Sequence, residues 1–286
     1  MYFVCPALTQ ETAVFPPLPA SSASPALDRR VDRLRRIAGA EPLLEGVLLY
    51  GSWTLGEADA HSDIEAYLFV RDEAVEEFDG RAFAERLAPL KLAYTNMYGI
   101  LAVVFDDLMR GEFHVEAAGP GIASVTGWRG AVHLPHPERA VLLDRSGRLT
   151  AAARELSEFE PPEPVATARR LTDELANWTL MLAQVLARGE IARGHALLQT
   201  AIAPQQLKLC RLLRSSTAHW LTPSRALEAD LPARDVRRYV ATTSSAREDE
   251  VRRAARASWE WSGELVREAG GSWPEGLYGE IAGLLR

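Results

Sequence analysis

The residues best suited to chemistry lie in one short stretch of the chain. Gly51 and Ser52 follow an apolar run, and after ten further residues comes Asp63-Ile64-Glu65. A Gly-Ser turn lets backbone N–H groups and a hydroxyl approach a phosphate, because no bulky side chain blocks the way. Two carboxylates separated by one residue on a strand point to the same side and can hold Mg²⁺ against a triphosphate. The order and spacing predict nucleotidyl transfer.

A third carboxylate is expected from a segment further along. In EFHVEA, Glu112, His114 and Glu116 share one face by the period of two that a strand imposes. A carboxylate there could position or deprotonate the attacking hydroxyl. Glu112 is preferred and Glu116 stays open as the alternative. A lone histidine is more often packed or solvated than a ligand, so His114 is left outside the predicted site.

The elements that must position these residues are readable from hydrophobic spacing. VDRLRRIA predicts a helix over 31–38, and GVLLY, a segment beginning near Asp63, GILAVVF and EFHVEA predict four strands. Beyond residue 150, leucines and tryptophans recur every three or four residues, which predicts a helical bundle. We therefore expect a loosely ordered leader over 1–30, a nucleotidyltransferase domain over 31–150 and a helical domain over 151–286.

Composition excludes several classes of protein. The 286 residues carry a formal charge of −7, which opposes wrapping a phosphate polymer, so nucleic acid is not expected as a partner. No uncharged apolar run is long enough to span a bilayer, so no membrane association is expected. Two distant cysteines, Cys5 and Cys210, form no metal or disulfide framework and fit a reducing cytoplasm.

Strand, Gly-Ser, a ten-residue gap and SDIE are typical of the polymerase-β-like nucleotidyltransferase superfamily. From about Val31 to about Glu268 the chain also resembles the two-domain lincosamide nucleotidyltransferases, bacterial enzymes that adenylylate antibiotics. The stretches that carry this resemblance are YGSWTLGEADAHSDIEAYLF, FDDLMRGEFHV, AVLLDRSGRL, ARGEIARGHALL and HWLTPSRALEADL.

The resemblance implies an α/β (α+β) nucleotidyltransferase domain with a mixed sheet, followed by an all-α helical domain that helps enclose the acceptor. It implies Asp63, Glu65 and Glu112 as Mg²⁺ ligands, with Glu112 also the general base. Gly51 and Ser52 would contact the nucleotide.

These inferences predict an Mg²⁺-dependent enzyme that transfers AMP from ATP to a hydroxyl of a small antibiotic, with a lincosamide preferred. One alternative is an aminoglycoside nucleotidyltransferase, although polycationic acceptors need more carboxylates than a lincosamide does. Another is a toxin–antitoxin-type nucleotidyltransferase that acts on a protein. The acceptor hydroxyl, ATP against other nucleotides, and a homodimer stay open.

Overall fold

The computed structural model describes residues 24–286, which form two compact units divided between Glu160 and Pro161. This division lies ten residues beyond the change in composition near residue 150. The reason is that α6 (Arg148–Arg154) packs Leu149 and Ala153 against the sheet of the first unit.

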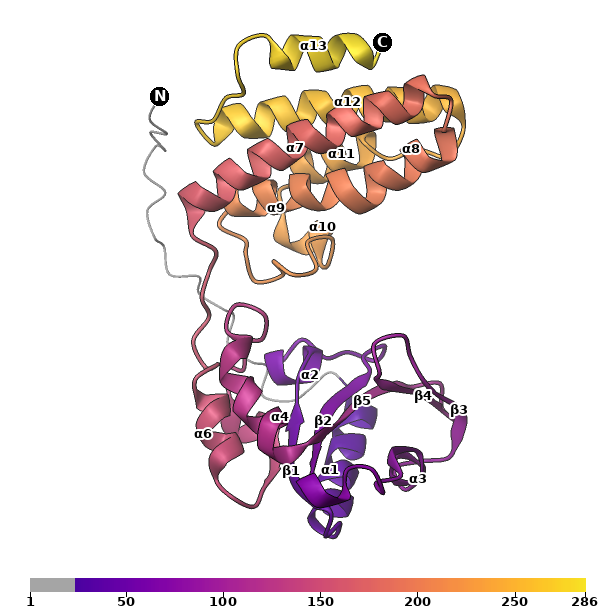
Figure 1. The fold of residues 1–286 in the computed structure, drawn as a ribbon, viewed down its shortest axis with the longest axis vertical. Coiled ribbons are helices and arrows are strands. Elements are labelled where there is room, and N and C mark those ends of the chain that lie inside the picture. Colours follow the sequence, from indigo (N-terminus) through magenta and orange to yellow (C-terminus); the bar gives the residue numbers. More distant parts are fainter. Residues whose placement is uncertain (1–23) are drawn as a thin grey trace. The chain divides into compact units, whose positions relative to one another are not determined.

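A six-stranded mixed sheet forms the centre of the first unit (Figure 1). The strands lie in the order β3-β4-β5-β2-β1-β6, and β2 and β5 are parallel while every other neighbouring pair is antiparallel. In chain order the elements are α1 (Pro25–Gly39), β1 (Leu44–Leu49), α2 (Ser52–Leu55), β2 (Ile64–Val70), η1 (Asp72–Ala74), α3 (Gly80–Glu85), β3 (Leu90–Thr95), β4 (Leu101–Phe105), β5 (Arg110–Ala117), α4 (Ala118–Ser124), η2 (Val125–Trp128), α5 (Pro137–Ala140), β6 (Val141–Asp144) and α6. The expected α/β domain with a mixed sheet is confirmed.

The first helix begins earlier than its hydrophobic spacing indicates. Ser24 caps α1 by accepting a hydrogen bond from the backbone N–H of Leu27, and Pro25 occupies the first turn, where its missing N–H costs nothing. The last six residues of the predicted leader are therefore helical, because a cap and a proline start the helix before the apolar repeat does. The rest of that leader, residues 1–23, lies outside the described residues.

Period-two alternation on β2 separates its two faces. Ile64, Ala66 and Leu68 point into a core that α1 and α3 cover, whereas Phe69 points into a second core that α4 and α6 cover. Glu65 and Tyr67 share the face of Phe69, and both are half-buried. Glu65 therefore lies on the side of the sheet that α4 and α6 cover, at the end of β2 that follows the α2 turn.

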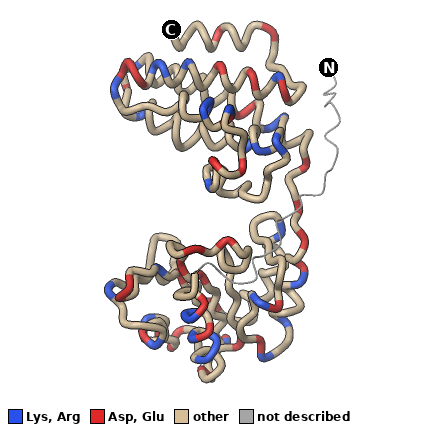
Figure 2. Tube along the Cα trace, turned by 180° about the vertical axis from the view of Figure 1, so that it is seen from behind, with Lys and Arg blue, Asp and Glu red and all other residues tan. Residues whose placement is uncertain are grey.

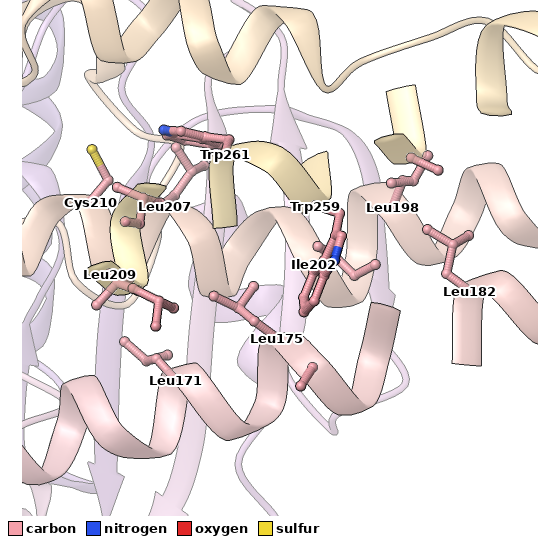
Figure 3. Packing of buried hydrophobic residues seen from close by; sticks show 14 of the residues in the cluster. Leu171, Leu175, Leu182, Leu198, Ile202, Leu207, Leu209, Cys210, Trp259 and Trp261 are labelled. Atoms are coloured by element: carbon pink, nitrogen blue, oxygen red, sulfur yellow. The ribbon is translucent and has the colours of Figure 1, made fainter. Parts of the chain in front are cut away.

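The second unit is helical, as expected. Its elements are α7 (Pro164–Ala187), α8 (Ile191–Leu197), η3 (Leu198–Ile202, a π-helical turn), α9 (Ala203–Leu213), α10 (Leu227–Asp230), α11 (Ala233–Ala241), α12 (Glu248–Glu268) and α13 (Leu277–Leu284). The long helices α7, α9 and α12 pack around one core, in which Trp259 lies against Leu175 and Ile202 (Figure 3). Trp259 and Trp261 are 1% and 2% exposed, so both tryptophans are part of this core.

Charged residues are distributed over both units. Figure 2 shows basic residues interleaved with acidic ones along the described trace. None of the helices in residues 24–286 combines the length and apolar character that a membrane span needs.

Candidate active site

A glycine turn leads from β1 to α2 and brings the backbone close to a carboxylate. Gly51 has φ +78° and ψ −155°, a conformation that is accessible to glycine but not to other residues. A Cβ placed on Gly51 would lie 1.7 Å from Oε2 of Glu65. The backbone N–H of Tyr50 donates to the carbonyl oxygen of Glu65 at 3.2 Å, which holds the turn beside β2. A side chain at position 51 would therefore have to displace the Glu65 carboxylate and also adopt a strained φ.

Ser52 directly follows this glycine as the first residue of α2. Its side chain is 8% exposed, and its carbonyl oxygen accepts from the backbone N–H of Glu57 at 2.9 Å. The hydroxyl of Thr54 donates to the carbonyl oxygen of Gly51 at 2.8 Å. These bonds fix the predicted Gly51-Ser52 turn in one conformation, next to the strand that carries Glu65.

Glu65 and Glu112 are direct partners in the parallel pairing of β2 with β5. Neighbouring strands lie about 4.8 Å apart, so the two side chains start side by side on the same face of the sheet. Asp63, two residues before Glu65, shares that face by the period of two. The register therefore brings the three predicted carboxylates to one end of this strand pair, which the sequence alone suggested without showing how the strands pair.

The charges of these carboxylates raise the pKa values of two neighbouring groups, the Tyr50 hydroxyl and the Arg110 guanidinium. Burial raises the pKa of the Tyr50 hydroxyl, and the charges of Glu65, Glu112 and Asp63 raise it further. The pKa of the Arg110 guanidinium is also raised, chiefly by its hydrogen bond to Asp63 and further by the charges of Glu112 and Glu65. All three carboxylates thus lie within electrostatic reach of the same tyrosine and the same arginine.

The donor set fits a hard divalent cation in its chemistry, since carboxylate oxygens are the ligands that Mg²⁺ prefers. However, within residues 24–286 no three side chains of the His, Cys, Asp and Glu types are gathered closely enough to hold a metal ion. Asp63 instead forms an ion pair with Arg110, whose Nη2 donates to Oδ2 of the carboxylate. A cation held by all three carboxylates would share the Asp63 carboxylate with Arg110 or displace the guanidinium from it.

Glu116 lies further along the same face, away from the glycine turn. It pairs with Phe69 in the β2–β5 register, four residues beyond Glu112 and therefore about 13 Å along the strand. Burial raises the pKa of the Glu116 carboxyl, and its Oε2 would lie 3.0 Å from a Cβ placed on Gly121 of α4. Glu112, not Glu116, is thus the glutamate of β5 that faces Glu65.

His114 is not among the predicted site residues, and in the structure it contacts two tyrosines, Tyr50 and Tyr67. Its Nε2 is hydrogen-bonded to the Tyr50 hydroxyl at 3.0 Å, and its ring stacks on Tyr67 with 4.0 Å between centroids. Tyr67 in turn contacts Trp128 at 4.5 Å. Burial lowers the pKa of His114, which favours the neutral imidazole. The period-two face shared with Glu112 was the available signal, but the partner Tyr50 lies 64 residues away.

Comparisons with known proteins identify the helical unit. Residues 166–273 match the family model of the lincosamide nucleotidyltransferase-like C-terminal domain. Together with the mixed-sheet unit that precedes it, this match indicates that the chain is a nucleotidyltransferase. The match confirms, for this part of the chain, the expected resemblance to the lincosamide nucleotidyltransferases.

Among solved structures, the crystal structure of an aminoglycoside 6-adenyltransferase from Bacillus subtilis is similar at 13% identity and a TM-score of 0.37. The match covers 89% of this chain and 98% of that one. A search of curated protein sequences found no match.

Proposed function

We propose that this nucleotidyltransferase inactivates a small antibiotic by transferring AMP from ATP to one of its hydroxyl groups, with Mg²⁺ and in the cytoplasm. The observation that carries the proposal is the pairing of Glu65 with Glu112 beside the Gly51 turn. Two carboxylates that face each other on adjacent strands, with a third two residues away, are suited to hold a divalent cation against a triphosphate.

Each residue of the site has a separate role in the proposed reaction. Asp63, Glu65 and Glu112 would hold Mg²⁺, which when bound offsets the negative charge on the triphosphate. The Gly51-Ser52 turn would contact the triphosphate through its backbone N–H groups and the Ser52 hydroxyl. The acceptor oxygen attacks the α-phosphorus, the bond to pyrophosphate breaks, and Glu112 accepts the hydroxyl proton.

A lincosamide is the acceptor that we favour. The helical unit matches the lincosamide nucleotidyltransferase-like domain. A lincosamide carries one amine and apolar arms, whereas an aminoglycoside is a polycation whose binding needs several carboxylates. The experiment below therefore also tests an aminoglycoside and a protein as the acceptor.

The test is incubation of the full chain with [α-³²P]ATP, Mg²⁺ and separate acceptors: lincosamides, aminoglycosides and a protein extract. A labelled lincosamide supports the proposal. A labelled aminoglycoside would keep the chemistry and change the acceptor, and labelled protein would favour the protein-modifying alternative. No labelled product with any acceptor would overturn nucleotidyl transfer to these three classes.

Two variants connect the label to the site. Asp63→Asn and Glu65→Gln keep the size of each side chain and remove its charge, so labelling should be abolished while the far-UV circular dichroism spectrum is kept. Asp72→Asn is a matched control, because Asp72 is a carboxylate at the start of η1, after β2, that accepts from the backbone N–H of Gly119 at 2.7 Å. That variant should still label the acceptor.

A further inference from the structure

Arg110 stands level with Asp63 at the ends of two paired strands. Gly111 pairs with Ile64 in the β2–β5 register, so the residues before them, Arg110 and Asp63, lie across from each other. The guanidinium and the carboxylate form an ion pair. The side chain of Arg110 is 64% exposed, against 22% for Asp63, so the arginine can move into solvent more easily than its partner can.

Three carboxylates act on the guanidinium of this pair. The hydrogen bond to Asp63 and the charges of Asp63, Glu112 and Glu65 all raise the pKa of Arg110, and Glu65 and Glu112 are partners in the β2–β5 register. Like charges held close together repel, so a positive group at this position stabilises the strand ends. A guanidinium and a divalent cation both meet this need, and both use the oxygens of Asp63.

We propose that Arg110 occupies Asp63 in the nucleotide-free enzyme in competition with the divalent cation, and turns to the triphosphate when nucleotide and metal bind. This proposal rests on the proposed function, because it assumes that the three carboxylates hold the cation. A guanidinium released from a carboxylate finds an equivalent partner in a phosphate, since both accept its paired N–H donors. Arg110 thereby couples metal binding to nucleotide binding.

Competition for Asp63 and a purely structural ion pair predict different effects of removing Arg110. Removing Arg110 should tighten metal binding to the free enzyme, because the cation no longer displaces a guanidinium. The same change should weaken binding of the nucleotide, because a phosphate contact is lost. A structural role alone would weaken both or change neither.

The experiment is calorimetric titration of Mn²⁺ into the nucleotide-free full chain, for wild type, Arg110→Gln and Arg110→Lys. We expect Arg110→Gln to bind Mn²⁺ about tenfold more tightly, which corresponds to about 1.4 kcal/mol, and Arg110→Lys to resemble wild type. Binding of a non-hydrolysable ATP analogue in the presence of Mn²⁺ should weaken in Arg110→Gln. Arg81→Gln, which removes an exposed arginine paired with Glu85 on α3, is the control and should change neither.

Folding of the variants is checked by thermal unfolding in EDTA and in Mn²⁺. Arg110→Gln should melt lower than wild type in EDTA, because Asp63 has lost its ion pair with Arg110, and should gain more than wild type from Mn²⁺.

Unchanged or weaker Mn²⁺ binding in Arg110→Gln would overturn the competition, and so would the absence of Mn²⁺ binding in both proteins. If Arg110→Gln leaves Mn²⁺ binding unchanged or weaker while Asp63→Asn weakens it, the competition fails and the proposed function stands. If neither Asp63→Asn nor Glu65→Gln changes Mn²⁺ binding, the proposed metal site fails together with this inference.

Discussion

The carboxylate of Glu65 lies where a side chain at position 51 would be, with Oε2 at 1.7 Å from the place of a Gly51 Cβ. Two separate requirements meet at this glycine: a left-handed φ of +78° and the absence of a Cβ. The turn therefore fixes the position of a carboxylate as well as the path of the chain.

Gly51→Ala should reduce turnover sharply, because the new methyl group must displace Glu65. The unfavourable backbone conformation should also lower the free energy of unfolding by about 1–3 kcal/mol. Steady-state kinetics and urea unfolding measure the two effects. Gly99→Ala is the matched control, since Gly99 has φ +79° and open space around its Cβ position. It should lose stability and keep activity, and equal activity losses in both variants would contradict a specific role for Gly51.

Glu112→Gln should lower kcat by about 10²–10⁴-fold if Glu112 is the general base. Glu116→Gln should leave kcat close to wild type, because Glu116 pairs with Phe69 and not with Glu65. Rates of AMP transfer at saturating ATP compare the two variants. A large loss in Glu116→Gln with little loss in Glu112→Gln would assign the base to the other glutamate.

Protonation of His114 should destabilise the fold at mildly acidic pH. Burial lowers the pKa of its imidazole, so the folded protein binds this proton less readily than the unfolded chain does. The stability that His114 contributes is complete above the unfolded pKa of about 6.5 and is lost as the pH falls from there toward the folded pKa.

Urea unfolding at several pH values between about 7.5 and 5 tests this, by comparing wild type with His114→Gln. The variant should lose less stability than wild type over the same interval. His136→Gln, at an exposed histidine, should follow wild type. If His114→Gln and wild type lose the same stability, the neutral buried state of His114 is wrong.

Arg211→Met should destabilise the helical unit by about 3–5 kcal/mol, the cost of removing one partner from a buried ion pair. Arg211 is fully buried and donates to Asp230 at 2.8 Å and to the carbonyl oxygen of Pro223 at 2.8 Å. Chemical unfolding followed by circular dichroism measures the loss. Arg193→Ala, which removes an exposed pair with Glu190, should cost at most about 1 kcal/mol. Similar losses in both variants would show that Arg211 is not a structural centre.

Much of the site was predictable because it depends on local periodicity. The period of two places Glu65 with Asp63 and Glu112 with Glu116, and the Gly-Ser turn follows from its residue types. The pairing partner of each strand is not predictable from local periodicity, because the β2–β5 contact joins residues 47 apart in the sequence. The choice of Glu112 over Glu116 as the neighbour of Glu65 therefore became visible only in the structure.

Two strands escaped prediction for physical reasons. The edge strand β3 has an exposed Leu92 and Tyr94 and no fully buried position, so its sequence lacks a clear buried face. β6 spans four residues, which is too short for a periodic signal. The contacts of His114 with Tyr50 and of Arg110 with Asp63 also join residues far apart in the sequence. Local sequence patterns therefore do not predict them.

The most direct test of the proposed chemistry is a crystal structure of the full chain with Mn²⁺ and a non-hydrolysable ATP analogue, in which anomalous scattering locates the ion. We expect the ion to be bound by oxygens of Asp63, Glu65 and Glu112 and by the triphosphate, with Arg110 moved away from Asp63. An ion held elsewhere beside the bound nucleotide, with these three carboxylates unchanged, would contradict the account.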